Sequence, residues 1–407
     1  MRQRTHPVTQ SLPSATSLMM TPPIRMTIFN ALYFAGLSGA LLFLPVWLEK
    51  SRGLDGTHIG MILAAAGFGR MFAGPVIAGW ADGQRDRHAA VKMLSLAALA
   101  AFGLLGLAPG FWLILAACLV GITSYWMIVG YVEAGLMRLC RGALTYPVAR
   151  GLGSAAFVVG SLSIGWGIDV YGAQSALWFI IAICAALAVW TWVLTPEIDE
   201  HAAPDLPLRV RLREGLALVR NPAFFMLIIG AGFVQASHAF YNAFGGLVWL
   251  NQGINGSWVG VLYSVGVGVE VLFLVALGGW SERFHPTGLL LAGALGATIR
   301  WGLLATQPDL PWLLPLQALH GLSFAATYLG TMRLIQMWFG NDRTPTAQMM
   351  YQSFAAAPEA ALATLMSGPL YDRFGAGGYW GMTGLAAIGI LLVWRLRTVP
   401  PPKLGAA

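Results

Sequence analysis

Residues 253–282 read GINGSWVGVLYSVGVGVEVLFLVALGGWSE, and residues 53–82, 200 positions earlier, read GLDGTHIGMILAAAGFGRMFAGPVIAGWAD. The two stretches align without a gap. Glycine and tryptophan coincide in both at the positions of Gly53, Gly56, Gly60, Gly79 and Trp80. Each stretch is a glycine-rich turn followed by about 20 apolar residues, which is long enough for a helix to cross a bilayer. The chain therefore contains a duplicated membrane-spanning helix.

Each copy also carries one ionisable residue at the same internal position, Arg70 in the first and Glu270 in the second. With a rise of about 1.5 Å per residue, both lie about 18 Å below the outer ends of their helices, near the bilayer midplane. A charge at that depth costs about 2.5–3.5 kcal/mol and persists only where it is paired or faces water. A duplicated membrane protein with a buried charge in each half has the pattern of a transporter.

The composition of the whole chain is that of a membrane protein. Of its 407 residues, 57% are hydrophobic and 10% are charged, whereas a soluble domain carries about 25% charged residues. The net charge of +7 does not indicate nucleic-acid binding, because the basic residues lie in short connections between apolar runs. The cysteines Cys118, Cys140 and Cys184 have no metal-ligand spacing, and we expect no metal and no cofactor.

Apolar runs of spanning length predict twelve helices. They fall at roughly 27–48, 58–80, 89–108, 111–137, 150–170, 173–195, 222–249, 258–281, 287–306, 311–338, 346–371 and 376–396. If both termini are cytoplasmic, most of the 24 Lys and Arg residues lie on the cytoplasmic side. The exceptions are Lys50, Arg52 and Arg373 outside and Arg70 and Arg300 within spans. This bias predicts that both termini face the cytoplasm.

The expected organisation is two pseudo-symmetric six-helix bundles joined by a polar linker. The predicted parts are a disordered tail at 1–26, an N-terminal bundle at 27–195, a linker at 196–221, a C-terminal bundle at 222–397 and a cytoplasmic tail at 398–407. The linker ends in a basic amphipathic stretch, which is typical of a helix on the membrane surface. The repeat extends further along the chain, because Asp169 ends the fifth run as Asp372 ends the eleventh.

This arrangement resembles the major facilitator superfamily over nearly the whole chain beyond residue 26. The resemblance implies an all-α membrane protein with twelve transmembrane helices in two six-helix bundles. The helix exits at 79–82 and 278–284 look like the family's loop motif, although Gly79 precedes the acid by three residues rather than four. The gating-loop residues implied by this motif are Asp82, Arg85, Glu282 and Arg283.

Shorter segments resemble the phenylpropionate permease branch of this superfamily. They are 149–154 (ARGLGS), 235–241 (QASHAFY), 299–302 (IRWG), 310–312 (LPW) and 317–320 (QALH). The charges are also similar to those of the lactose permease group, whose pattern places Glu133, Arg150, Glu270, Arg300 and His320 on helices 4, 5, 8, 9 and 10. That group carries a proton-coupling carboxylate one turn after the histidine, where this chain has Ser323. Another acid is therefore expected to carry the proton.

One ion pair across the two halves is predicted from the resemblance. Helices 2 and 11 face each other in this family, and Glu359 lies about as far below the outer surface as Arg70. We therefore predict an Arg70–Glu359 contact or salt bridge. Such a pair is either a static fastening between the halves or a participant in coupling and substrate binding, and the sequence leaves both open.

A second group of polar residues falls at a common depth on helices 7 to 10, namely Glu270, Arg300, His320 and His238. Burial disfavours an ionised carboxylate whereas a nearby arginine favours it, and this conflict is typical of a proton switch. We expect Glu270 to carry the proton, with Arg300 and His320 tuning it and Glu359 as a second acid. A fixed charge cluster is the alternative. His238 is either a cavity residue or a packing residue.

Further substrate-binding residues are expected on cavity faces. They are Gln235, Tyr241, Asn242, Gln317 and Tyr328, together with Glu133 and Arg150. The last two lie nearer the cytoplasm, where a structural ion pair is equally expected. An anionic substrate would take Arg70, Arg150 or Arg300 as its counter-charge, because a guanidinium fork matches a carboxylate.

The combined interpretation is a monomeric, proton-coupled importer in a bacterial-type inner membrane. By resemblance the substrate is an aromatic carboxylate such as phenylpropionate, with a sugar or nucleoside as the second choice. A proton-driven exporter of drugs or metabolites suits the same buried acids. ATP-driven transport is excluded because the chain has no G-x-x-x-x-G-K-[ST] loop. An enzyme acting within the membrane would have only Glu133, Glu270 and Glu359 as acids, and the duplication argues against it.

Overall fold

The computed structural model describes residues 21–82, 88–194, 208–276, 279 and 283–402. Its first half contains α2 (Pro22–Ser38), η1 (Gly39–Phe43), α3 (Leu44–Lys50), α4 (Gly56–Asp82), α5 (His88–Leu105), α6 (Phe111–Leu139), α7 (Tyr146–Tyr171) and α8 (Gln174–Trp190). Helix α9 (Leu208–Val219) follows. The second half contains α10 (Pro222–Ala236), α11 (Ala239–Asn251), α12 (Gly256–Ala276), α14 (Pro286–Leu304), α15 (Leu310–Ala318), η2 (Gly321–Ala326), α16 (Thr327–Tyr351), η3 (Gln352–Ala356), α17 (Ala357–Phe374), η4 (Gly375–Gly378) and α18 (Tyr379–Leu396).

In the part of the chain that the structure describes, these elements form the twelve predicted spans. Eight helical stretches there are long and apolar enough to cross a bilayer. The last of them, Arg343–Leu396, holds two spans, because the chain turns at Gly375, where φ is 53°. Helices α4 and α8 and the rod made by α15, η2 and α16 complete the twelve.

Several spans are broken near their middle. The first span passes through the π-helical turn η1, and the seventh is interrupted at Ser237 and His238, between α10 and α11. Turns η2 and η3 are also π-helical, and they interrupt the tenth and eleventh spans. Gly340 (φ 59°, ψ −172°) marks the kink inside α16 where the tenth span ends and the eleventh begins. Such turns insert a residue into the helix and are frequent at functional sites.

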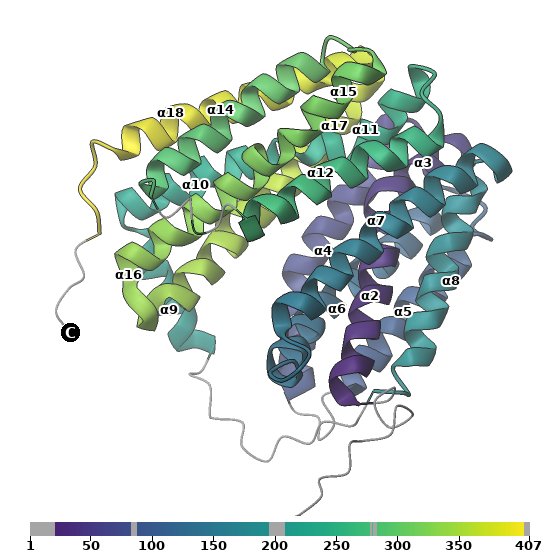
Figure 1. Cartoon of the computed structure of the whole chain (residues 1–407), viewed down its shortest axis with the longest axis horizontal. Coiled ribbons are helices and arrows are strands. Elements are labelled where there is room, and N and C mark those ends of the chain that lie inside the picture. Colours follow the sequence, from purple (N-terminus) through teal and green to yellow (C-terminus); the bar gives the residue numbers. More distant parts are fainter. Residues whose placement is uncertain (1–20, 83–87, 195–207, 277–278, 280–282, 403–407) are drawn as a thin grey trace, which may run out of the picture.

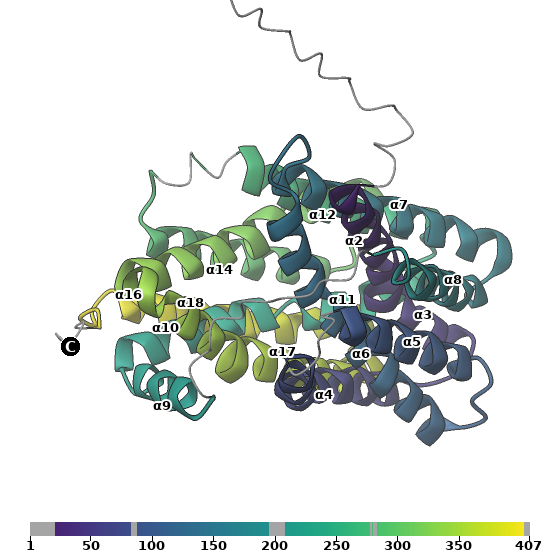
Figure 2. The same ribbon diagram turned by 90° about the horizontal axis from the view of Figure 1, so that it is seen from below.

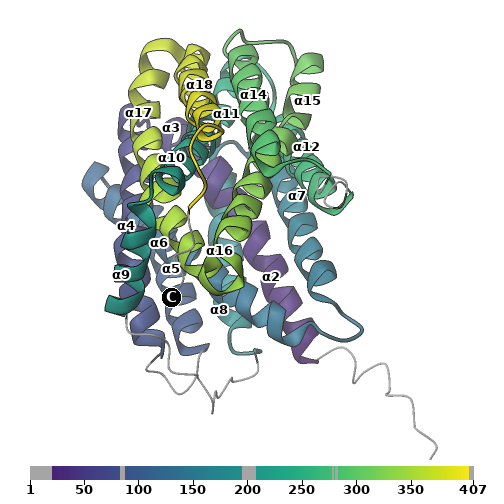
Figure 3. The same ribbon diagram turned by 90° about the vertical axis from the view of Figure 1, so that its left-hand side faces the viewer.

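The two halves form two separate groups of helices that meet along two helix pairs (Figure 1). Helix α4 packs on α17, and α12 packs on α7. Figure 3 shows the two pairs on opposite sides of the molecule. Glycine permits this approach: a Cβ placed on Gly60 would lie 3.1 Å from Cα of Gly368. The duplicated stretches therefore become the helices through which each half contacts the other.

The ends of the predicted parts fall partly outside the described residues. Residues 1–20 of the predicted tail, 196–207 of the linker and 403–407 of the C-terminal tail lie outside them, as does residue 195 at the end of the N-terminal bundle. Helix α2 begins at Pro22, within the predicted tail, because proline is well suited to the first turn of a helix. The amphipathic end of the linker is α9, which lies against α16 and α10 (Figure 2).

Candidate functional site

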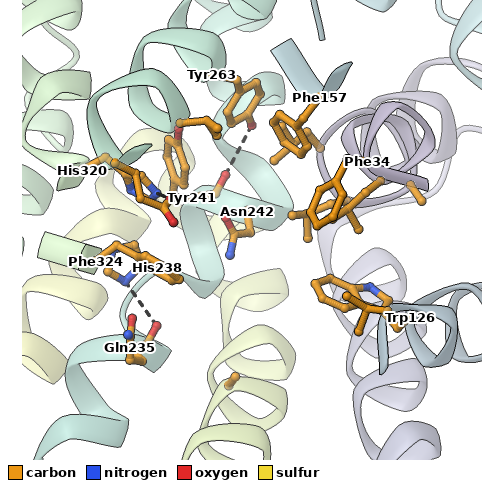
Figure 4. A pocket seen from close by; sticks show the side chains of 18 of the residues that line it. Phe34, Trp126, Phe157, Gln235, His238, Tyr241, Asn242, Tyr263, His320 and Phe324 are labelled. Carbon is orange, nitrogen blue, oxygen red and sulfur yellow. Dashed lines mark hydrogen bonds and ion pairs between the residues drawn. The ribbon is translucent and has the colours of Figure 1, made fainter. Parts of the chain in front are cut away.

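A cavity of about 630 Å³ lies between the two halves. Figure 4 shows Phe34, Trp126 and Phe157 of the first half on one side and His238 and Tyr241 of the second half on the other. This volume is within the range of small-molecule sites in proteins. The cavity is thus placed where the sequence predicts a substrate path.

Aromatic rings make up much of the cavity wall. The lining rings of Phe, Tyr and Trp are Tyr33, Phe34, Trp126, Phe157, Tyr241, Tyr263, Phe324 and Tyr328. Only Tyr241 and Tyr328 are among the predicted site residues. The others were not identifiable from the sequence, because an aromatic residue within an apolar run has the same signature whether it faces lipid, core or cavity.

The two ionisable residues of the repeat both line this cavity. Arg70 reaches it from α4 and Glu270 from α12. The guanidinium carbon of Arg70 lies 4.5 Å from the centre of the Trp126 ring, a cation–π contact. The duplication therefore places one cation and one acid at equivalent positions on opposite halves.

The predicted Arg70–Glu359 salt bridge is wrong. Glu359 is in the first turn of α17, and its Oε2 atom is buried without a hydrogen-bond partner in the described residues. This carboxylate lies against Gly232 of α10, and Glu359 does not line the cavity. The side chain follows the π-helical turn η3, which displaces it around the helix axis relative to a straight helix. Glu359 is therefore directed at α10 instead of α4.

Arg300 is the centre of a buried hydrogen-bond network. It has 0% exposed surface. Its Nη2 donates to Oε1 of Gln317 (2.7 Å), and its Nη1 donates to Nδ1 of His320 (2.9 Å) and to Oγ of Ser323 (3.4 Å). The guanidinium carbon also lies 4.5 Å from the ring centres of Tyr241 and Trp301. Arg300 and Gln317 do not line the cavity, so in this structure neither can touch a solute directly.

The contact with Arg300 determines which ring nitrogen of His320 carries the proton in the neutral ring. A guanidinium has only donors, so Nδ1 of His320 must be the acceptor, and the neutral ring then carries its proton on Nε2. Nε2 lies 3.4 Å from Oε2 of Glu270. His320 therefore connects the buried guanidinium to the cavity carboxylate, and a second proton on its ring would face Arg300.

His238 is predicted to be either a cavity residue or a packing residue, and in the structure it is both. It lines the cavity, and its Nδ1 lies 3.2 Å from the carbonyl oxygens of Val234 and Gln235, so Nδ1 is the donor. Its Nε2 lies 3.3 Å from Oγ of Ser323, which also accepts from Arg300. The break between α10 and α11 puts His238 in this position.

Glu133 and Arg150 form an ion pair of 2.9 Å. The hydroxyl of Tyr146 donates to Oε2 of Glu133 (2.8 Å), and Nη1 of Arg150 donates to Oγ of Ser154 (3.3 Å). Arg150 lines the cavity and its guanidinium carbon lies 4.2 Å from the ring centre of Phe34. The positive charge of Arg150 is therefore already balanced by a protein carboxylate.

The remaining predicted residues divide by position. Those that line the cavity are Gln235, Tyr241, Asn242 and Tyr328. Arg283 is exposed beyond α12. Asp82 is the last residue of α4, and its side chain, Arg85 and Glu282 lie outside the described residues. Within the described residues, no three His, Cys, Asp or Glu side chains come close enough together to hold a metal ion.

Comparison with known proteins agrees with this architecture. The sequence model of the MFS_1 like family matches residues 23–382, and the chain belongs to this family of major facilitator superfamily transporters. It is 28% identical over 371 residues to the probable 3-phenylpropionic acid transporter of Escherichia coli (strain K12), a match that covers 90% of this chain and 96% of that protein. It is 23% identical over 380 residues to the maltose permease of Geobacillus stearothermophilus, covering 91% and 94%.

Solved structures of similar fold are also transporters. The nucleoside transporter NupG superposes with a TM-score of 0.79 at 15% identity, covering 93% of this chain and 99% of that chain. A bacterial homologue of the human lysosomal transporter Spinster, in an inward-facing and occupied conformation, has a TM-score of 0.69 at 12% identity and covers 95% and 97%. The predicted fold and family are confirmed, and the protein is a multi-pass membrane transporter.

Proposed function

We propose that the protein moves a small aromatic carboxylate, such as 3-phenylpropionate, across the bacterial inner membrane together with protons. The two halves would expose the central cavity alternately to each side, with both termini in the cytoplasm. Each chain has its own cavity, which suits a monomer as the working unit.

The proposal rests on how the charges of the three arginines near the cavity are balanced and on which of them reach the cavity. Arg150 is neutralised by Glu133, and Arg300 is buried behind the wall. Arg70 lines the cavity, and no carboxylate of the described residues forms an ion pair with it. A cation in a largely apolar cavity attracts an anion, and a guanidinium suits a carboxylate.

The rest of the wall suits an aromatic ring. Trp126 lies beside Arg70, and Phe34 and Phe157 line the same side of the cavity (Figure 4). A phenyl ring can stack on such side chains while its carboxylate reaches Arg70. The similarity to a probable 3-phenylpropionic acid transporter supports the same substrate class.

Glu270 is the proposed proton carrier. As a carboxylate its Oε2 lies 3.4 Å from Nε2 of His320, and it balances the charge of Arg300 through that ring. As a carboxylic acid it no longer balances that charge, and its new O–H finds no acceptor on Nε2, which already holds a proton. Protonation of Glu270 therefore changes the hydrogen bonding of the second half at the cavity wall, which is what coupling requires.

A sugar or nucleoside is the second substrate class. The amides of Gln235 and Asn242 line the cavity, and they could serve the hydroxyl groups of such a solute. The similarity to a maltose permease and to the fold of NupG is in line with it. A neutral solute leaves Arg70 without a counter-charge, and for this reason we favour the carboxylate.

The test compares an acid with its neutral amide on purified protein. Arg70→Gln is expected to weaken binding of 3-phenylpropionate about 10-fold to 100-fold, because a charge-assisted hydrogen bond contributes about 1.5–3 kcal/mol. Binding of 3-phenylpropionamide should change less than about threefold. Arg397→Gln, at an exposed arginine after α18, is the matched control and should leave both affinities unchanged.

Equal losses for acid and amide would show that Arg70 acts only on the structure of the cavity. Tight binding of maltose or uridine by a wild-type protein that ignores 3-phenylpropionate would reject the carboxylate in favour of the second class.

A further inference from the structure

Two aspartates make the same set of hydrogen bonds at one end of the molecule. Near the end of α17, Asp372 accepts from the backbone N–H of Gly56 (2.6 Å) and of Thr57 (2.8 Å), and from the Thr57 hydroxyl (2.5 Å). Near the end of α7, Asp169 accepts from the N–H of Gly256 (2.6 Å) and of Ser257 (2.8 Å), and from the Ser257 hydroxyl (2.5 Å). We call these the Asp372 latch and the Asp169 latch.

Each latch joins one half of the transporter to the other. The Asp372 latch connects α17 of the second half to α4 of the first, and the Asp169 latch connects α7 of the first half to α12 of the second. Both lie at the end of the molecule opposite to α9 (Figure 1). The internal duplication has therefore produced two equivalent bonds between the halves at one end of the cavity.

The latches use donors that a helix cannot satisfy itself. The first N–H groups of a helix have no partner within it, and its N-terminus carries a partial positive charge. In α4 the local cap Asp55 accepts from the backbone N–H and ring Nδ1 of His58, and in α12 Asn255 accepts from the N–H of Trp258. The two N–H groups that precede each of these are capped from the other half. A carboxylate with two acceptor oxygens suits this arrangement.

Backbone contacts next to each latch depend on the same alignment. A Cβ on Gly260 would lie 2.5 Å from the carbonyl oxygen of Ser161, and Gly56 contacts the backbone of Gly368. Close by, Nζ of Lys50 donates to Asn251 (2.7 Å), and Asn251 donates to the hydroxyl of Tyr371 (2.8 Å). The halves cannot separate at this end without breaking both latches.

We propose that Asp169 and Asp372 form a paired gate that holds this end of the cavity closed and that opens when both aspartates release their helix N-termini. The inference rests on the proposed function only in requiring that this end of the cavity opens during the transport cycle. Two of the three bonds of each latch lie at exposed positions, where water can replace them, and the bond from the glycine N–H is part-buried. The latches therefore bias an equilibrium between closed and open forms without blocking it.

The test measures the width of this end directly, without any solute. Spin labels at Leu107 and Thr306, which are exposed in the two halves, report the distance across it. The buried native cysteines Cys118, Cys140 and Cys184 are replaced by alanine in the full-length chain. Wild-type protein is expected to give mainly a short distance, with a minor fraction of a longer one.

Asp169→Asn and Asp372→Asn keep the shape but leave one acceptor oxygen, and their amide group faces an N–H donor. Each variant is expected to raise the ratio of the longer to the shorter distance about fivefold, the size of a lost helix cap. The double variant should raise the ratio about 25-fold, because distant sites add. Asp309→Asn is the matched control, because Asp309 is exposed before α15 and makes no side-chain cap.

A double variant that keeps the wild-type thermal unfolding and the wild-type distance would overturn the gate. A double variant that widens this end while the protein transports no carboxylate would support the gate and contradict the proposed function. An equal shift with Asp309→Asn would show a general charge effect and would also reject the gate.

Discussion

Arg300 carries a full charge with no exposed surface, and no carboxylate of the described residues forms an ion pair with it. Its partners are the oxygen of Gln317, Nδ1 of His320 and the hydroxyl of Ser323. An unpaired buried charge is costly, so each of these acceptors matters. At the residue scale, an arginine buried behind the cavity wall is thus balanced at a distance, through His320, by Glu270.

Removal of the Gln317 acceptor tests this view of Arg300. Gln317→Leu leaves Nη2 of Arg300 without its 2.7 Å partner. The free energy of unfolding should fall by about 1–3 kcal/mol, because a buried donor is left unsatisfied. Thermal unfolding in detergent measures the change, and Gln352→Leu, at an exposed glutamine of η3, is the control. An unchanged unfolding midpoint for Gln317→Leu would mean that Arg300 finds another acceptor.

The depth of single residues in the membrane could be predicted from the sequence, but the direction of their side chains could not. The rise per residue placed Arg70 and Glu270 near the membrane centre, and both do line the cavity. It also placed Glu359 at that depth, but the side chain faces α10, because η3 precedes it. Depth follows from counting residues, whereas the direction of a side chain depends on each turn before it.

At the scale of elements, the repeated glycines explain how α12 approaches α7. Gly256 and Gly260 let the backbones touch, whereas Gly268, further along α12, has open space around it. The same helix therefore contains glycines that packing requires and one that it does not. The repeat predicted matching helices in the two halves, but the contacts of their glycines depend on the way the halves dock.

This difference predicts opposite effects of two identical substitutions in α12. Gly260→Ala places a Cβ 2.5 Å from the carbonyl oxygen of Ser161 and should lower the free energy of unfolding by about 1–3 kcal/mol. Gly268→Ala should raise it by about 0.5–1 kcal/mol, because alanine favours a helix over glycine. Unfolding of the two variants by denaturant in mixed micelles compares them, and equal effects would contradict the close contact of α12 with α7.

The broken spans could not be predicted from the sequence. The stretch GALLF of η1 contains no residue that distinguishes a π-helical turn from an α-helix. Such turns depend on packing against neighbouring helices. They matter for the site, because His320 immediately precedes η2 and His238 lies between α10 and α11.

At the scale of the whole molecule, the protein is a transporter in which two related groups of helices surround one aromatic cavity (Figure 1). The membrane class and the twelve spans could be predicted from composition, run length and repeat, because these features do not depend on side-chain packing. The family could be predicted from the resemblance of its loop motif and short segments. The residues of the cavity wall could not be predicted from the sequence, because Trp126, Phe34 and Phe157 line the cavity only through the direction of their side chains.

The central claim is that the carboxylate and the proton cross together through this cavity, and the initial rate of 3-phenylpropionate uptake into proteoliposomes tests it most directly. An inward proton gradient is imposed or omitted, and protein-free liposomes correct for the uncharged acid that crosses lipid unaided. We predict that the gradient raises the rate about tenfold for wild-type protein and less than twofold for Glu270→Gln, because the amide cannot take up the proton. A wild-type rate that does not respond to the gradient, or a Glu270→Gln variant that responds as wild type does, would contradict the account.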